Sequence, residues 1–140
     1  MDEVWKNYPF AQDRSIHLSR FELVNDKWSD DNINLKWDNV RKLRKTVTAA
    51  LEVKRRDKEI GSSLEAGIQI YLNDTDILAS VSDIDLAEIC ITSSFELINK
   101  KPDSKCFVLD EEHEIGVIVR IAKGNKCQRS WKVTEDVGLD

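Results

Sequence analysis

A stripe of apolar residues at helical spacing places the strongest constraint on how this chain folds. Its members recur every three or four positions and are Trp37, Val40, Leu43, Val47, Ala50 and Leu51, with Lys54 completing the pattern. This spacing predicts an amphipathic helix with one buried face. Residues that favour helix N-caps precede the stripe, namely Ser29, Asp30, Asp31 and Asn32. Since Gly61 follows it, we expect one long helix over about residues 35–58.

The period of the apolar residues changes after Gly61. In "SLEAGIQIYL", apolar side chains occupy every second position from Leu64 to Leu72, which predicts a β-strand with one buried face. Ser62 and Glu65 also match the capping box S-x-x-E, which would begin a helix instead. The alternation continues for four steps through β-branched and aromatic residues, so the strand is favoured.

Shorter patterns predict the remaining elements. A short acidic helix is expected from Asp83 to Glu88. The further expected strands are "ICITSSFELI" (89–98), "CFVL" (106–109) and "GVIVRIA" (116–122). Turns are expected near Pro102 and at "DEEHE" (110–114). The predicted fold class is therefore α+β, a long amphipathic helix followed by a small mixed α/β sheet region.

Basic residues are concentrated in the expected helix. Between Arg41 and Lys58 the chain has eight Lys or Arg residues and two acidic residues, against a net charge of −5 for the whole chain. The stretch therefore carries +6 and the remainder −11. A local basic segment can face phosphates even in an acidic protein, so its arginines are candidate RNA contacts: Arg41, Arg44, Arg55 and Arg56. The plainer interpretation, which composition alone favours, is a solvated helix face.

The sequence offers little for catalysis. Its only histidines, His17 and His113, lie in no triad, metal or nucleotide motif, and there is no glycine-rich phosphate loop. His113 is expected in a solvated turn and His17 in a packing or capping position. We expect no catalytic residue and a binding role.

The cysteines and the N-terminus bear on the cellular compartment. Three cysteines, Cys90, Cys106 and Cys127, are expected to be reduced thiols. The start "MDEVWKNYPF" lacks the basic and apolar regions of a secretory signal, and no apolar run reaches membrane-spanning length. The expected location is the cytoplasm.

The segment "GNKCQRSWK", residues 124–132, resembles half of a metal site. Structural zinc sites use four ligands, often as C-x2-C pairs, but here Ser130 stands where the second cysteine would be. No second pair follows, so we expect no bound metal. Arg129 and Trp131 can instead hold a phosphate and stack on an unpaired base. The alternative is that Trp131 only covers the edge of the sheet.

Four stretches together resemble the region near the C-terminus of bacterial-type isoleucyl-tRNA synthetase. In order, they are "VWKNYP", "SIHLSRF", "KWDNVRKLRKTVTAALEVKRRDKEIGSSLEAGIQIYL" and "AKGNKCQRSWKVTEDVG". The resemblance spans nearly the whole chain. Its most specific parts are the helix running into "IGSSLEA" and the "KCxRxWK…DVG" tail.

The resemblance implies a domain assignment. Residues 1–60 would be the end of an anticodon-binding helical domain, 61–123 a small α+β C-terminal subdomain, and 124–140 a truncated or degenerate zinc-module tail. Lys126, Arg129 and Trp131 would lie near the tRNA anticodon loop, and Cys127 matches the first zinc ligand of the family.

The resemblance also implies a function. Isoleucine tRNA and the remaining domains of a parent synthetase would be the partners, with neither membrane nor DNA involved. ATP and zinc are the cofactors expected of the parent family, and none is expected in this chain. Because the HIGH-like and KMSKS-like signatures are missing, this chain alone should not attach isoleucine to tRNA. The alternative is a structural or protein-interaction domain without RNA contact, in which a bare apolar helix stripe drives self-association.

Overall fold

The computed structural model describes residues 2–11, 14–21 and 23–139. Contacts divide the chain into a first unit that ends at Asp31 and a second unit that begins at Asn32. The ranges 1–60 and 124–140 also include residues that lie outside the described part, namely Met1, Gln12, Asp13, Glu22 and Asp140. No helix in the described part combines the length and the apolar character needed to cross a membrane.

The first unit consists of short helical turns and local contacts. Its elements are α1 (Asp2–Lys6) and the 3-10 turns η1 (Ile16–Leu18) and η2 (Asp26–Trp28). Trp5 stacks on Tyr8 with ring centroids 5.5 Å apart, and Phe10 meets Tyr8 edge-on at 5.7 Å. The aromatic residues near the N-terminus therefore pack on one another.

The long helix expected from the apolar stripe is confirmed as α2, Asp31–Arg56. It begins four residues earlier and ends two residues earlier than the expected range of 35–58. Its buried residues are Val40, Leu43, Thr46, Val47, Ala50 and Leu51. The stripe is therefore buried along the middle of the helix, whereas the first two turns are largely exposed.

Four strands form a mixed sheet in the order β2-β1-β4-β3. They are β1 (Ala66–Leu72), β2 (Ser94–Asn99), β3 (Phe107–Leu109) and β4 (Glu112–Ile121). β1 pairs parallel to β2, and β4 pairs antiparallel to both β1 and β3. A parallel pair needs a long crossover, and the chain between β1 and β2 supplies it as two short helices.

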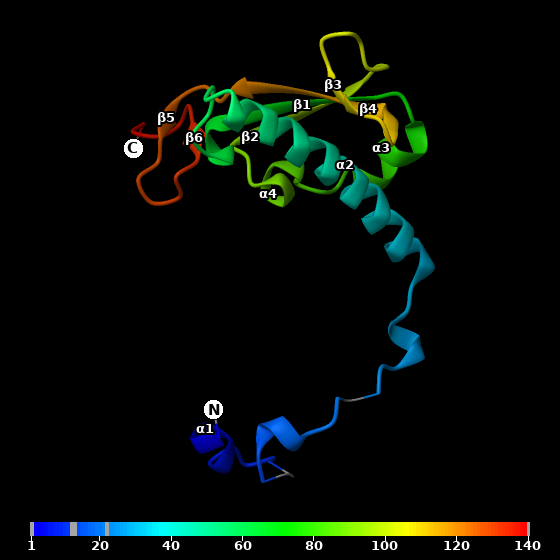
Figure 1. Ribbon diagram of the computed structural model, residues 1–140, viewed down its shortest axis with the longest axis vertical. Helices are drawn as coiled ribbons and strands as arrows, with labels where there is room; N and C mark the ends of the chain where they lie inside the picture. Colours follow the sequence, from blue (N-terminus) through cyan, green and yellow to red (C-terminus); the bar gives the residue numbers. More distant parts are fainter. Residues whose placement is uncertain (1, 12–13, 22, 140) are drawn as a thin grey trace. The chain divides into compact units, whose positions relative to one another are not determined.

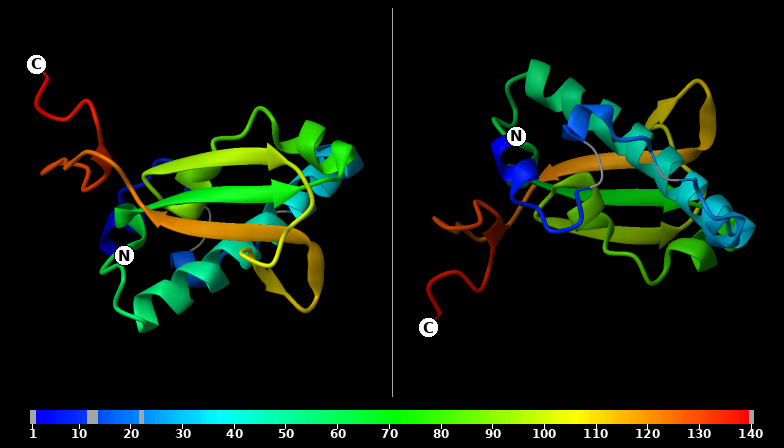
Figure 2. Two further views of the ribbon diagram at one scale, coloured as in Figure 1. Left: turned by 90° about the horizontal axis from the view of Figure 1, so that it is seen from above. Right: turned by 90° about the horizontal axis from the view of Figure 1, so that it is seen from below.

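The helices and the sheet share one core. Every second residue of β1 is buried on the same face, namely Ala66, Ile68, Ile70 and Leu72, and these residues join the buried stripe of α2 in a single apolar cluster. Figures 1 and 2 show α2 and α4 on one face of the sheet, while the other face carries no helix of the described second unit. The α+β architecture is confirmed, with the long helix α2 and the four-stranded mixed sheet in the second unit.

The start of β1 corrects the sequence prediction. Leu64 and Glu65 lie in a 3-10 turn, η3 (Ser63–Glu65), and the strand begins at Ala66. The Ser62 Oγ accepts a hydrogen bond from the Leu64 N–H at 3.3 Å, and the Glu65 carboxylate accepts one from the Gly61 N–H at 2.9 Å. The S-x-x-E motif therefore forms the 3-10 turn, and the alternating pattern forms the strand directly after it.

The segment between β1 and β2 also differs from expectation. It forms two helices, α3 (Thr75–Val81) and α4 (Leu86–Cys90), where we expected one from Asp83 to Glu88 and a strand from residue 89. Asp74 and Asp85 each cap a helix by accepting two backbone N–H bonds. Since these caps fix helical turns, β2 starts only at Ser94.

Further differences concern β3, β4 and the tail. β3 begins one residue later than expected, and β4 extends from residue 112 to 121, so His113 lies in a strand rather than in a turn. The tail forms two short paired strands that no sequence pattern predicted, β5 (Asn125–Lys126) and β6 (Val133–Thr134).

Candidate nucleic-acid interface

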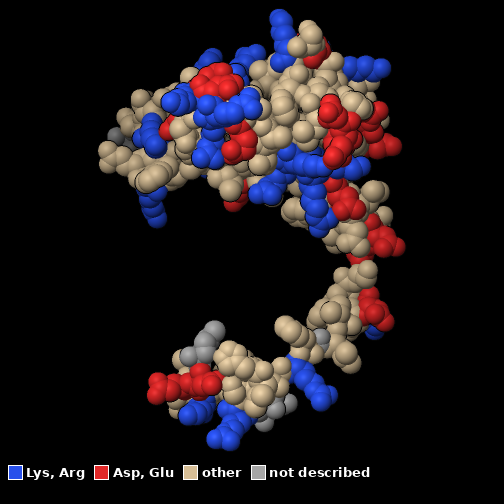
Figure 3. All heavy atoms as spheres, in the orientation of Figure 1, with Lys and Arg blue, Asp and Glu red and all other residues tan. Residues whose placement is uncertain are grey.

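The four predicted arginines occupy exposed positions on α2, and three of them already have acidic partners. Arg41 pairs with Asp38 (2.5 Å), Arg55 with Glu52 (2.8 Å) and Arg56 with Asp57 (3.5 Å). Exposed pairs of this kind contribute only about 0–1 kcal/mol, so a phosphate can replace the carboxylate at little cost. Figure 3 shows lysines and arginines along α2 interspersed with acidic residues, and further acidic residues over α3.

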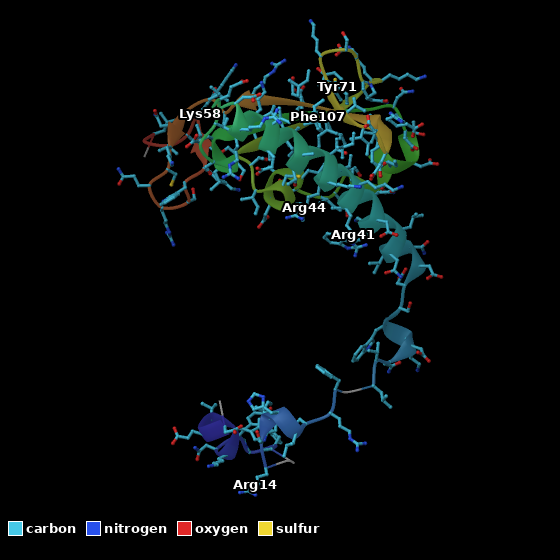
Figure 4. The ribbon with its side chains drawn as sticks, in the orientation of Figure 1. Arg14, Arg41, Arg44, Lys58, Tyr71 and Phe107 are labelled. Atoms are coloured by element: carbon cyan, nitrogen blue, oxygen red, sulfur yellow. The ribbon has the colours of Figure 1, made fainter. Side chains whose placement is uncertain are left out.

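Arg44 has a different kind of partner. Its Nε donates to the backbone carbonyl of Ile89 at 3.2 Å, which ties α2 to the end of α4. Figure 4 shows Arg41 and Arg44 along one side of α2, with Lys58 beyond the C-terminal end of the helix. The guanidinium of Arg44 is therefore positioned at the junction of two helices by a backbone carbonyl.

Arg44 and Arg55 line the same groove. The groove has a cavity volume of about 340 Å³ and runs between α2, the Gly61–Ser63 turn and the end of α4. Thr48 and Glu52 line its α2 side, between the two arginines. Positions 44, 48, 52 and 55 follow the three- and four-residue spacing of one helix face, which is why these side chains line the same groove.

Arg56 lines a neighbouring hollow together with Arg55 and Lys58. Lys58 is an exposed cation in the left-handed conformation, with φ of 59°, just after α2 ends. Lys58 belongs to the basic stretch 41–58, but the sequence does not single it out as a candidate contact. Its place just after the predicted helix and shortly before Gly61 is the sequence feature that could have identified it as a site residue.

The tail forms a tight hairpin around Cys127. The Cys127 N–H donates to Lys132 O, and the Trp131 N–H donates to Cys127 O, both at 2.8 Å. Gly124 adopts φ of 113°, and a Cβ there would overlap the carbonyl of Thr134, so only glycine fits. The hairpin thereby holds Trp131 in a left-handed conformation at the tip, with 60% of the residue exposed.

Trp131 and Lys126 form a cation–π pair. The Lys126 Nζ lies 5.2 Å from the centre of the Trp131 ring, and both residues line a shallow hollow with Cys127 and Gln128. Arg129 is exposed in the turn of the same hairpin. The tail thus pairs the Trp131 ring with the Lys126 ammonium, and the contact of these residues and Arg129 with RNA stays a prediction.

The hairpin is attached to the end of the sheet near the groove. Lys126 Nζ lies 3.6 Å from the Glu65 carboxylate, which also accepts the Gly61 N–H. The Gly61 N–H and, to a lesser extent, Lys126 lower the pKa of the Glu65 carboxyl. Ser93 adds a second link, because its Oγ accepts from the Val133 N–H at 2.6 Å. The tail therefore lies at the same end of the second unit as Gly61 and the C-terminal end of α2, whereas Arg44 lies nearer the middle of that helix, three residues after Arg41.

The geometry around Cys127 bears on the half zinc motif. Hydrogen bonds from Ser130 and Arg129 lower the pKa of the Cys127 thiol, with the Ser130 N–H lying 3.5 Å from the sulfur. Among the described residues, no group of three or more His, Cys, Asp or Glu side chains is placed to hold a metal ion. The expectation that no metal binds stays a prediction.

Comparison with known proteins gives these features a context. The isoleucine–tRNA ligase of Agrobacterium fabrum is 44% identical over 140 residues, which cover 99% of this chain and 14% of the ligase. The chain is homologous to one segment of bacterial isoleucine–tRNA ligases. The enzyme of Bradyrhizobium diazoefficiens is 43% identical over 139 residues, and that of Brucella melitensis 43% identical over 141 residues.

The match covers the whole chain and a small part of the ligases. The chain spans about 14% of the length of these relatives. No family model matches it. The resemblance noted from the sequence is confirmed, and the relatives' shared segment includes both α2 and the tail hairpin.

Proposed function

We propose that the chain is an RNA-binding segment of an isoleucine–tRNA ligase and contacts the anticodon region of isoleucine tRNA. The observation that carries the proposal is the 44% identity along 99% of the chain to a protein named isoleucine–tRNA ligase. Two groupings support it: Arg44 and Arg55 line one groove, and Lys126 and Trp131 form a cation–π pair in the tail.

The proposal assigns a role to each part of the chain. Residues 1–60 are the end of an anticodon-binding helical domain, 61–123 a small α+β subdomain, and 124–140 a degenerate zinc-module tail. The ATP-dependent attachment of isoleucine, in the cytoplasm, belongs to other domains of such a ligase. We expect no catalytic residue in this chain.

Tail contacts combine stacking with charge. An unpaired anticodon base can stack on Trp131 once Lys126 leaves the ring, and the released ammonium can then face a phosphate. Arg129 adds a further cation in the same turn. Binding by such contacts weakens as salt rises, because each phosphate contact releases counterions.

Filter binding of isoleucine tRNA to the 140-residue chain tests the proposal. We expect Trp131→Ala to weaken binding about 5- to 100-fold, the range for loss of one base-stacking contact. Trp28→Ala is the matched control, since Trp28 is an exposed tryptophan outside the second unit. No association at low salt, or equal effects of the two substitutions, would overturn the proposal.

A second candidate function is a protein-interaction surface. The first turns of α2 expose Ile33 (54%), Leu35 (65%) and Trp37 (40%), although the stripe from Val40 onward is covered by the sheet. Ile33 and Trp37, four positions apart, share one side of the helix, and large apolar surface is seldom left bare in soluble proteins. The occupant in this candidate is another domain of the ligase, and light scattering during a tRNA titration separates the two functions. Self-association unaffected by tRNA favours the interaction surface.

A further inference from the structure

The groove between α2 and α4 combines two cations with hydroxyl groups. Arg44 and Arg55 stand at either end of one helix face, with Thr48 between them. Ser62 and Ser63 line the groove as well. Nothing in the family resemblance assigns a ligand to this groove.

We infer that the groove binds the RNA backbone, with neighbouring phosphate groups held by Arg44 and Arg55 and by the hydroxyls between them. The inference deepens the proposed function and rests on it. A planar guanidinium suits phosphate because several of its five N–H donors can bind two oxygens at once. The bonds to Ile89 O and Glu52 occupy one donor group of each arginine, Nε of Arg44 and Nη1 of Arg55.

The hydroxyl groups have protons to donate. Ser62 Oγ accepts the Leu64 N–H, so its own proton is available to an anion. Thr48 is exposed on α2, and Ser63 is half-buried beside Ser62. A phosphate between the arginines is thus offered neutral donors as well as charge.

Glu52 is the one carboxylate that lines the groove among the described residues. It pairs with Arg55 at 2.8 Å and opposes a free anion. Both members of the pair are exposed, so the phosphate exchanges with the carboxylate at small cost. Glu52→Gln removes this opposing negative charge and should therefore tighten phosphate binding. Loss of the arginine charges would weaken it.

Ile91 forms an apolar rim beside the arginines. It adopts φ of 56° at the end of α4 and is 54% exposed. A β-branched residue in this conformation is strained, and such strain clusters at functional sites. The exposed side chain offers an apolar surface to the ribose or base next to the bound phosphate.

Paired substitutions test the inference. Arg44→Gln with Arg55→Gln removes the groove cations, and Lys100→Gln with Lys105→Gln removes the same charge from exposed positions between β2 and β3, away from the groove. We expect the groove pair to weaken tRNA binding about 10-fold and to reduce the salt slope by about one to two units, and the control pair to weaken binding less than about 3-fold. Equal losses, or none for the groove pair, would overturn the inference.

Opposite-charge substitutions sharpen the result. Glu52→Gln should tighten tRNA binding about 3-fold, and Glu111→Gln, which frees Lys45 outside the groove, serves as its control. A looser or unchanged complex for Glu52→Gln, with Glu111→Gln as tight or tighter, counts against a groove phosphate.

A titration with inorganic phosphate separates this inference from the proposed function. Amide NMR shifts confined to Ser62, Ser63 and the neighbouring groove residues, without tRNA binding, would support the phosphate site and overturn the proposed function. If Arg44→Gln with Arg55→Gln leaves tRNA binding intact, the phosphate site alone is overturned. If phosphate causes no amide shifts and tRNA does not bind, both the phosphate site and the proposed function are overturned.

Discussion

Three residues other than glycine adopt the left-handed conformation in the described chain: Lys58, Ile91 and Trp131. Each lines one of the hollows at the end of the second unit that carries the candidate interface. Backbone strain of this kind costs about 1–3 kcal/mol per residue and is kept where surrounding structure enforces it. For Ile91 the enforcing contact is the bond from the Thr92 N–H to Ala87 O at 2.8 Å, with Thr92 fully buried.

Replacing Ile91 by glycine should therefore stabilise the protein. Relief of the left-handed strain outweighs the extra chain entropy of glycine, so we expect the free energy of unfolding to rise by about 1 kcal/mol. Urea denaturation measures the change. Ala79→Gly, in an exposed position of α3, is the control and should lower the free energy of unfolding by about 0.5–1 kcal/mol. A loss for Ile91→Gly would show that the strain is absent.

Cys127 and Cys90 should differ in reactivity. The Ser130 hydrogen bonds lower the pKa of Cys127, whereas burial raises that of Cys90 to about 11. Since the thiolate is the reactive form, iodoacetamide should modify Cys127 before Cys90 as the pH is raised from about 6 to about 9. Peptide mass spectrometry follows both sites, and Ser130→Ala should move the Cys127 profile to higher pH. Earlier modification of Cys90 would contradict this account.

Among the elements, α2 is both the main structural helix and the carrier of the basic side chains. Its buried face packs on the sheet through Leu43 and Val47, which have 0% exposure, and the opposite face carries the arginines. One helix therefore fixes the interface relative to the sheet. Damage to the core should reach the groove, whereas changes in the first turns should not.

Leu43→Ala tests that division of α2. Loss of a fully buried leucine should lower the free energy of unfolding by about 2–5 kcal/mol, because it leaves a cavity between helix and sheet. Leu35→Ala, at a 65% exposed position on the same helix, should change it by less than about 0.5 kcal/mol. Thermal unfolding of both variants gives the comparison, and similar effects would mean that α2 does not pack as described.

Elements with long periodic patterns were predictable from the sequence. α2 and β1 repeat their apolar residues over many positions, so local spacing was enough. α3 has only seven residues, and β5 and β6 have two each, too few for any period. Their positions depend on Asp74 capping and on the contact between Ser93 and β6, which are fixed by the folded chain.

At the scale of the whole molecule, the sequence identified the charges of the candidate site but not their grouping. Arg44 and Arg55 were selected from charge, yet the groove that joins them needs Ser62 and the end of α4 from later in the chain. Lys126 and Trp131 were selected from the tail motif, and the link to Glu65 that holds them near the groove is likewise nonlocal. Such groupings follow from tertiary packing, which spacing alone does not encode.

Hydroxyl-radical footprinting of isoleucine tRNA on the 140-residue chain is the most direct measurement of where this protein meets RNA. The account predicts protection confined to the anticodon stem and loop. Trp131→Ala should reduce protection in the loop, and Arg44→Gln with Arg55→Gln should reduce it in the flanking backbone. Protection of the acceptor stem alone, or an unprotected tRNA under conditions that saturate binding, would contradict it.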